Sequence, residues 1–275
     1  MNLRFPFYLM ATIGLSGTAF ADQAPKPSSS ELMEKCGDYK ILLEPVEKGE
    51  VGRSKFPRTV AIVTDRIRRH TGAAVVNFVG AQAAEIRFPN TKRWGMHSAK
   101  AFNLVVTTKG DFGIYEVVGR GDAGQYDGSD TVLSMQDFVK EDIHWYVSKD
   151  PLIESKHIRD ATVKLKQGDD GREVHTIDLH FGKHETRTVQ DFADLVKENV
   201  GSPMLAALDG RALKSIMFTD IDTEKPINFN PGFVPEYVQA FSSVIAHRTL
   251  PIAVKYQKIS ISRPKDGVED CPILY

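Results

Sequence analysis

The densest group of side chains that could do chemistry is a histidine-rich stretch that contains His175, Asp178 and His180. The apolar residues between them alternate as in a strand, which places Asp178 and His180 on one face and His175 on the other. A carboxylate beside an imidazole could act as a general base, and three such ligands could bind a transition metal such as zinc. Because His175 falls on the wrong side, surface histidines of a hairpin are the favoured interpretation. A periplasmic hydrolase, with or without a metal, that uses these residues stays the alternative.

A glycine-rich stretch nearby contains Asp122, Asp127 and Asp130. Calcium takes carboxylate and carbonyl oxygens from such loops, but this spacing does not match an EF-hand. A solvated acidic turn is therefore favoured, with a calcium site as the alternative. The same stretch spells G-x-G-x-x-G from Gly119 to Gly124, yet turn residues follow where a phosphate-binding helix would have to begin. No G-x-S-x-G nucleophile motif occurs, so an enzyme is the less favoured class.

A basic segment offers a different kind of site. Apolar residues at helical spacing after Pro57 predict a helix that stops at Gly72, and Arg58, Arg66 and Arg69 belong to it. We expect their charges to project into solvent, so that the helix steers an acidic partner. Trp94, in a basic turn, would add an aromatic anchor. Residues 111–150 hold nine acids and three bases, so charge is polarised along the chain. The predicted partner is another protein or an anionic envelope polymer.

Hydropathy patterns give the elements that must position these residues. A second helix is expected at 235–248. Gln-Asp-Phe occurs at 136–138 and again at 190–192, each time after a strand–turn–strand pattern and at an expected helix start. Two similar ββα units are therefore one interpretation. Strands are expected at 73–79, 84–88, 102–108, 114–118, 161–166, 174–181 and 251–261. Hairpins with interspersed helices predict an α+β fold with an antiparallel or mixed sheet.

The N-terminus reads as an export signal. A short basic start, an apolar run and Ala19-Phe20-Ala21 predict a cleaved signal peptide over 1–21 and a periplasmic or secreted protein. Residues 22–31 read as a flexible leader, and 32–275 as one globular region with sub-units near 32–100, 101–200 and 201–275. Cys36 and Cys271 are the only cysteines, and in an oxidising compartment we expect a disulfide between them.

Composition sets the class of function. The formal net charge is −1, which argues against a general nucleic-acid binder, and no later segment is apolar enough to span a membrane. No cofactor is expected apart from the metal alternatives above. The favoured function is an exported, non-enzymatic binding protein, such as an inhibitor or immunity-type partner of an envelope-acting protein.

Overall fold

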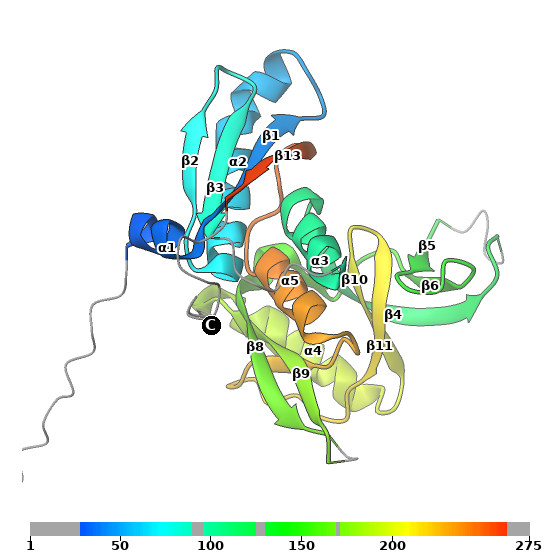
Figure 1. The fold of residues 1–275 in the computed structure, drawn as a ribbon. Helices are drawn as coiled ribbons and strands as arrows, with labels where there is room; N and C mark the ends of the chain where they lie inside the picture. The colour runs from blue at the N-terminus through cyan, green and yellow to red at the C-terminus, as the bar shows by residue number, and fades with distance from the viewer. Residues whose placement is uncertain (1–27, 90–95, 125–129, 169–170, 263–275) are drawn as a thin grey trace, which may run out of the picture.

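A computed structural model describes residues 28–89, 96–124, 130–168 and 171–262 (Figure 1). One part of the molecule is built from the N-terminal residues together with the last described strand. Its elements are α1 (Ser29–Cys36), β1 (Asp38–Pro45), α2 (Glu50–Thr71), β2 (Val75–Phe78), β3 (Ala84–Pro89), α3 (Met96–Thr107) and β13 (Val254–Ile261).

The four strands of this N-terminal part form one antiparallel sheet in the order β13-β1-β3-β2. Helix α2 connects β1 to β2, and β3 lies between these two strands. Helix α3 leaves β3, and β13 returns on the far side of β1. This is the split β-α-β-β-α-β arrangement of ferredoxin-like folds. Because β13 comes from near the end of the chain, residues 108–253 form an insertion between α3 and the last strand of the sheet.

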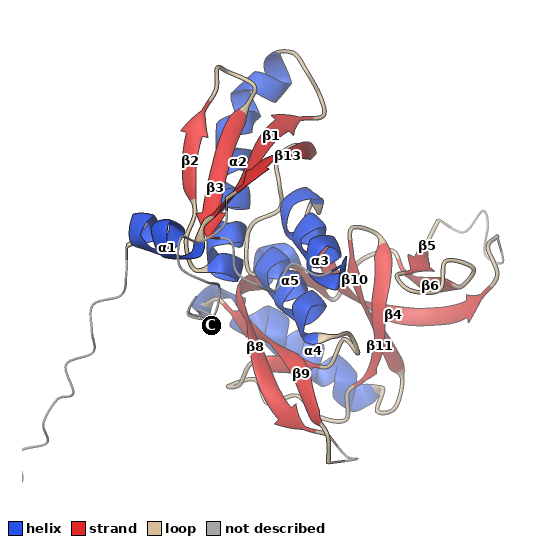
Figure 2. Cartoon of the chain, viewed as in Figure 1, coloured by secondary structure: helices blue, strands red, loops and turns tan. Residues whose placement is uncertain are grey.

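Helices α2 and α3 cover one face of the sheet of the N-terminal part (Figure 2). Ile41 and Leu43 of β1 pack with Val63 and Ile67 of α2, and all four are fully buried. Gly72 ends α2 in the left-handed region, and its amide donates to the carbonyl of Arg68, as the sequence predicts.

The insertion holds the remaining elements. They are β4 (Phe112–Gly121), β5 (Val132–Asp137), β6 (His144–Ser148), β7 (Ile153–Glu154), η1 (Ser155–His157), β8 (Ile158–Gln167), β9 (Glu173–Phe181), η2 (Lys183–Glu185), α4 (Thr186–Glu198), β10 (Pro203–Leu208), β11 (Arg211–Met217), β12 (Ile227–Phe229) and α5 (Pro235–Ile245). One sheet has the order β10-β11-β5-β6-β4-β7, and β10 also pairs with β4, which closes five of its strands into a ring. The other sheet has the order β12-β9-β8.

Strand β10 contributes to both cores of the insertion, and helix α5 joins the insertion to the N-terminal part. Leu205 and Ala207 of β10 point into the small core of the ring, whereas Met204, Ala206 and Leu208 point into the large core with α4 and α5. Alternation therefore buries both faces of one strand. Helix α5 packs against α2 and α3 on one side and against β8 and β9 on the other, so it lies between the N-terminal part and the β12-β9-β8 sheet (Figure 1).

The predicted α+β class is confirmed, but two predicted elements are wrong. Residues 102–108 belong to helix α3, in which Ala101, Phe102, Val105 and Val106 recur at helical spacing and are all buried. Packing against the sheet and α5 outweighs the strand preference of the adjacent valines. The predicted helix at Ser134–Glu141 begins instead as strand β5.

Capping chemistry explains the second error. Asp137 accepts hydrogen bonds from the amides of Val139 and Lys140, both at 2.9 Å, as an N-capping acid would, but it does so in the turn after a strand. Only the second Gln-Asp-Phe lies in a helix, α4, so the two stretches are not similar ββα units. The insertion also divides the chain differently from the expected thirds. Helix α1 begins at Ser29, inside the expected leader, with Ser28 and Glu31 forming a capping box.

Candidate protein-binding surface

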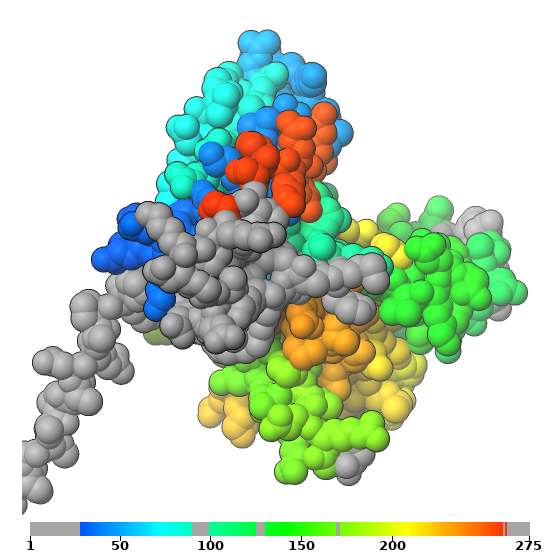
Figure 3. Space-filling model, viewed as in Figure 1, coloured from blue at the N-terminus to red at the C-terminus, as the bar shows by residue number. Residues whose placement is uncertain are grey.

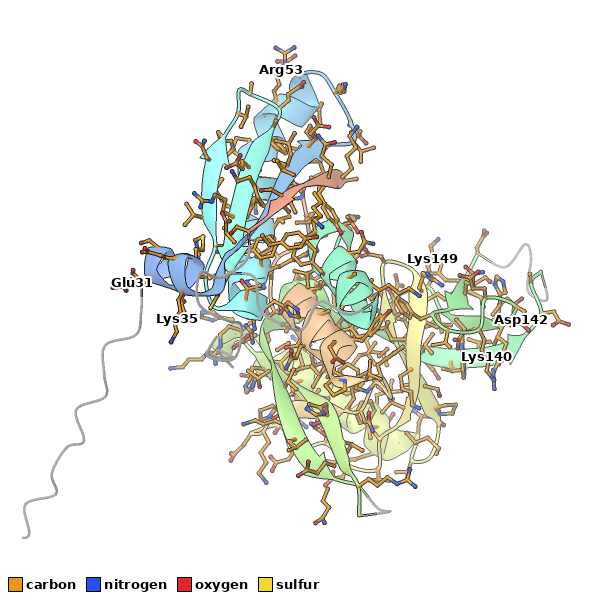
Figure 4. The ribbon with its side chains drawn as sticks, viewed as in Figure 1. Glu31, Lys35, Arg53, Lys140, Asp142 and Lys149 are labelled. Atoms are coloured by element: carbon orange, nitrogen blue, oxygen red, sulfur yellow. The ribbon has the colours of Figure 1, made fainter. Side chains whose placement is uncertain are left out.

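One end of the N-terminal sheet brings three short segments together. Strands β1 and β3 are antiparallel, with Leu43 opposite Ala84, so the end of β1 lies beside the β2–β3 turn. The side-chain amide of Gln82 in that turn donates to the carbonyl of Gly49, one residue before α2, at 3.3 Å. Figure 4 shows Arg53 at this extremity of the molecule.

Large apolar side chains at this end are exposed. Val46, Val51, Phe78 and Val79 have exposed fractions of 55, 54, 50 and 53 %. The ring of Phe78 meets Phe56 edge-on at 6.5 Å, and Phe56 is fully buried, so Phe78 continues the core to the surface. Exposed apolar residues from separate segments that gather in one place indicate an interaction site more strongly than scattered ones do.

Basic side chains lie close to these apolar residues in the chain. Lys48, Arg53, Lys55 and Arg58 of the β1–α2 loop and the first half of α2 are exposed, and the exposed acids of the same segment are Glu47 and Glu50. Apolar contacts beside an excess of positive charge suit an acidic polypeptide. We call this set the tip surface: Val46, Lys48, Val51, Arg53, Lys55, Arg58, Phe78 and Val79.

Of these residues the sequence analysis named only Arg58 as a binding candidate, and that role stays a prediction. The apolar members were missed, because apolar residues in a sequence are expected to be buried. Figure 4 also shows Lys140, Asp142 and Lys149 on the arm formed by β4, β5 and β6, away from the tip, so the acidic stretch occupies another part of the molecule.

The prediction that Arg66 lies on the surface is wrong. Its side chain is fully buried. The guanidinium donates to the carbonyls of Thr108 at 2.6 Å, Lys109 at 3.1 Å and Arg248 at 3.4 Å. These carbonyls belong to the two chain crossings between the N-terminal part and the insertion. Burial lowers the Arg66 pKa to about 10, which the charge of Asp209 partly opposes, so the guanidinium stays positive at neutral pH.

Arg69 also faces the insertion. It pairs with Asp160 of β8 at 2.7 Å and donates to the carbonyl of Ala161, while keeping a side-chain exposed fraction of 33 %. Both arginines were expected to project outward because they lie near the polar side of α2. Packing of α5 and β8 against the C-terminal half of the helix covers that side. Helical periodicity alone contains no information about these later elements.

Asp209 binds the same segment as Arg66, although the sequence patterns had assigned it no role. We call this region, where the chain passes between the N-terminal part and the insertion, the junction. Its carboxylate accepts from three successive amides, those of Lys109, Gly110 and Asp111, at 2.7, 2.9 and 2.7 Å. Asp209 and Gly210 form the β10–β11 turn with φ of 51° and 74°. An Asp-Gly pair between strand patterns is a strong hairpin signal, which the sequence offered at this place.

Two histidines lie close to the same junction. Burial lowers the pKa of His70 on α2, and Glu236 of α5 partly opposes this effect. Burial also lowers the pKa of His247, although its ring nitrogen Nδ1 lies 2.6 Å from the carbonyl oxygen of Ser243. The nearby charges of Arg66 and Arg69 lower the pKa of His247 further.

The histidine-rich stretch lies on β9 and does not form a catalytic pair there. Asp178 accepts from the side-chain amide of Asn228 at 2.5 Å, while His180 Nε2 lies 2.9 Å from the hydroxyl of Thr162. His180 does line a cavity of about 230 Å³. In the described part of the chain no three His, Cys, Asp or Glu side chains gather as a metal site would need, and His175 has no metal partner there. The hydrolase alternative therefore gains no support from the geometry.

Three predicted residues, Trp94, Asp127 and Cys271, lie outside the described part of the chain. Asp122 and Asp130 are exposed on either side of the gap that contains Asp127, so the calcium alternative stays a prediction. Cys36 ends α1 and is 1 % exposed. Cys271 lies outside the described residues, so the disulfide also stays a prediction, which a titration of free thiols in the native protein would test.

Comparison with known proteins gives a likeness of fold. No family model and no curated protein matches the sequence. The crystal structure of SecDF in its super-membrane-facing form matches with a TM-score of 0.54 and 14% identity, over 83% of this chain. This chain spans 30% of that SecDF chain.

Two further SecDF structures match less well. The structure of SecDF as a membrane component that enhances protein export has a TM-score of 0.49 at 14% identity, over 80% of this chain and 99% of that one. SecDF from Thermus thermophilus, a translocon-associated membrane protein, has a TM-score of 0.33 at 15% identity, over 85% of this chain and 32% of that one. None of the helices in the described residues has the length and apolar character to cross a membrane. The likeness to the first structure is one of fold.

Proposed function

We propose that this chain is a non-enzymatic binding protein that acts outside the cytoplasm and recognises an acidic segment of another polypeptide through the tip surface. The observation that carries the proposal is that four half-exposed apolar side chains at one end of the N-terminal sheet are accompanied by the exposed Lys48, Arg53, Lys55 and Arg58 of the β1–α2 loop and the first half of α2. Apolar contacts supply affinity, and the surrounding charges supply the preference for an acidic partner and a fast encounter.

The likeness to SecDF supports the setting of this proposal. SecDF is described as a membrane component that enhances protein export, and the first of its structures shares this fold over most of the present chain. The predicted signal peptide would direct this chain into the export route. A role in handling or regulating exported polypeptides agrees with both, and it is more specific than the inhibitor or immunity-type role that the sequence alone favours.

The test is binding to a permanently unfolded acidic polypeptide, reduced carboxymethylated lactalbumin, measured by fluorescence anisotropy. The double variant R53E/R58E reverses two tip charges. The matched control K164E/K166E reverses two exposed charges on β8, in the insertion. We expect the tip variant to bind at least tenfold more weakly than the wild type, and the control to bind like it.

Salt gives a second readout. The difference between wild type and R53E/R58E should shrink as the salt concentration rises, because screening removes the same interaction. Equal weakening by the control would mean that net charge, and not the tip, determines binding. Absence of wild-type binding at low salt would overturn the proposal. Binding of anionic lipid vesicles in place of the polypeptide would replace the partner with a membrane surface.

A further inference from the structure

The two edges of the N-terminal sheet are protected very differently. A strand at the edge of a sheet presents unpaired amides and carbonyls, and proteins commonly shield such edges with lysines, prolines or bulges. Strand β13 has two of these devices. It carries Lys255 and Lys258, both exposed, and its register with β1 shifts between Lys40 and Ile41, which leaves Ile259 as an extra residue.

Strand β2, at the other edge, has none of them. Residues 73–80 include no charged residue and no proline. Val75, Asn77 and Phe78 are exposed, and so is Val79 just beyond the strand. One edge of β2 pairs with β3, from Val75 opposite Arg87 to Phe78 opposite Ala84. In the described ranges no other strand pairs with β2.

The other edge strands differ from β2. Strand β8, at the edge of the three-stranded sheet, carries Lys164 and Lys166. Strands β7 and β12 have only two and three residues, and every residue of β12 is at least partly buried. Among the described edge strands, β2 is therefore the one that combines exposure, apolar side chains and the absence of charge. In the space-filling view, β2 belongs to the cyan part of the N-terminal unit, on its outer side (Figure 3).

We infer that the free edge of β2 binds an extended segment of another polypeptide, which adds a fifth strand to the N-terminal sheet. Main-chain hydrogen bonds would then supply affinity that does not depend on sequence, and alternate side chains would supply selectivity. This inference rests on the proposed function and gives it a mode of binding. The β2 edge ends at the tip surface, since Phe78 and Val79 belong to both.

This location fixes the chemistry of the segment. Its central residues should be uncharged and apolar at alternate positions, to contact Phe78 on the helix side and Val75 on the open side. Acidic residues should follow at the end that reaches Lys48, Arg53 and Lys55. A second copy of the chain is less suitable, because a ladder along a four-residue strand buries far less than the roughly 1,200 Å² of a stable interface.

The experiment uses one synthetic peptide in two forms and two variants of the protein. The peptide alternates valine and threonine and ends in glutamates. Its second form carries methyl groups on alternate backbone nitrogens, which removes main-chain donors while keeping every side chain. V75K/N77K places lysines on β2 in the way that β13 carries them, and Q257K is the matched control on exposed β13. Binding is followed by fluorescence anisotropy.

We expect V75K/N77K to lower affinity for the unmethylated peptide at least tenfold, Q257K to leave it unchanged, and methylation to abolish binding to the wild type. Equal binding of both peptide forms would overturn the inference, because side chains alone would then account for affinity. A wild-type dimer that V75K/N77K converts to a monomer, in analytical ultracentrifugation, would also overturn it in favour of a second copy.

The experiments distinguish failure of the tip surface from failure of strand addition. If R53E/R58E loses carboxymethylated lactalbumin while V75K/N77K binds it normally, the tip surface stands and strand addition is wrong. If neither variant differs from the wild type with either probe, both proposals are wrong. Circular dichroism of each variant shows whether the fold is retained, which we expect because all four substituted residues are exposed.

Discussion

The two halves of helix α2 use the same residue type for opposite purposes. In the first half, Arg53 and Arg58 are exposed and belong to the tip surface. In the second half, Arg66 is fully buried and Arg69 pairs with Asp160 of the insertion. The basic residues along this one helix therefore belong to two features, the proposed tip surface and a structural junction, and only the packing of the fold distinguishes them.

The comparison also explains why the second half tolerates a buried charge. Burying an isolated guanidinium is costly unless its donors are satisfied. Arg66 is surrounded by three carbonyls from the two chain crossings, and Asp209 binds the amides of the same segment. The junction thus assembles charges of both signs around Gly110, whose φ of 92° suits glycine and where a side chain would meet the guanidinium.

The largest effect should come from replacing Arg66 with Met, which keeps similar length but removes the charge and all donors. Three carbonyls lose a charged partner, and each such hydrogen bond contributes about 1.5–3 kcal/mol. We expect R66M to lower the free energy of unfolding by at least about 3 kcal/mol in urea denaturation. R58M makes the same chemical change on the exposed half and is the control. An R66M protein as stable as R58M would mean that the junction does not depend on the guanidinium.

Asp209 should come next. Its replacement by Ala leaves the amides of Lys109, Gly110 and Asp111 without their carboxylate and should cost about 1–3 kcal/mol of stability. D209N keeps one acceptor oxygen, so it should lose less stability than D209A. Hydrogen exchange of these amides should accelerate in D209A before exchange in β1 or β3 changes. Uniform acceleration throughout the protein would instead indicate general destabilisation.

These same residues show how much of the fold could be predicted from the sequence. Local patterns predicted α2, α5, the β8–β9 hairpin and the α+β class, because periodicity and turn chemistry are properties of neighbouring residues. They could not predict that β13 joins a sheet begun more than 200 residues earlier, with Tyr39 opposite Ile261. They failed at α3, where packing decides, and at Arg66, whose three carbonyl partners lie 42, 43 and 182 residues further along the chain.

The site was predictable to a similar degree. Arg58 follows from charge and helical spacing. The exposed Val46, Val51 and Phe78 do not, because apolar residues in a sequence are expected to be buried. Their meeting at one end requires the antiparallel pairing of β1 with β3 and the contact between Gln82 and Gly49. Exposure of an apolar side chain depends on the whole fold and not on its neighbours in the chain.

The stability of the protein should depend on pH, because two partly buried histidines lie near the second half of helix α2. Burial lowers the pKa of His70 and His247 below the ordinary value of 6.5, which favours the neutral imidazole in the folded protein. The unfolded chain then binds more protons as pH falls, and stability should be full above about pH 6.5 and decrease below it. Asp38 and Asp137 have pKa values below 3.8 and contribute only at lower pH.

The measurement is the melting temperature between about pH 7.5 and pH 5, a window that contains the unperturbed histidine pKa. We expect the melting temperature to fall with pH in the wild type and to fall less in H70Q and H247N. The groups that face these histidines are Glu236, Arg66, Arg69 and Asp65. A melting temperature that is independent of pH in the wild type, or that falls as much in both variants as in the wild type, would contradict this assignment.

The smallest effect on stability should come from the exposed half of the helix. Arg58 is exposed, and exposed charge substitutions usually change stability by no more than about 0.5 kcal/mol. R58E should therefore unfold like the wild type, whereas R66E, the same reversal two turns further along the helix, should not fold because it places a carboxylate against three carbonyls. Urea denaturation of R58E and the soluble yield of R66E give the two readouts. If R58E lost as much stability as R66M, its side chain would be part of the junction, and any binding defect of R53E/R58E would have to be attributed to unfolding. If R58E is neutral, a loss of binding in R53E/R58E belongs to the surface itself, because the helix that carries it remains folded.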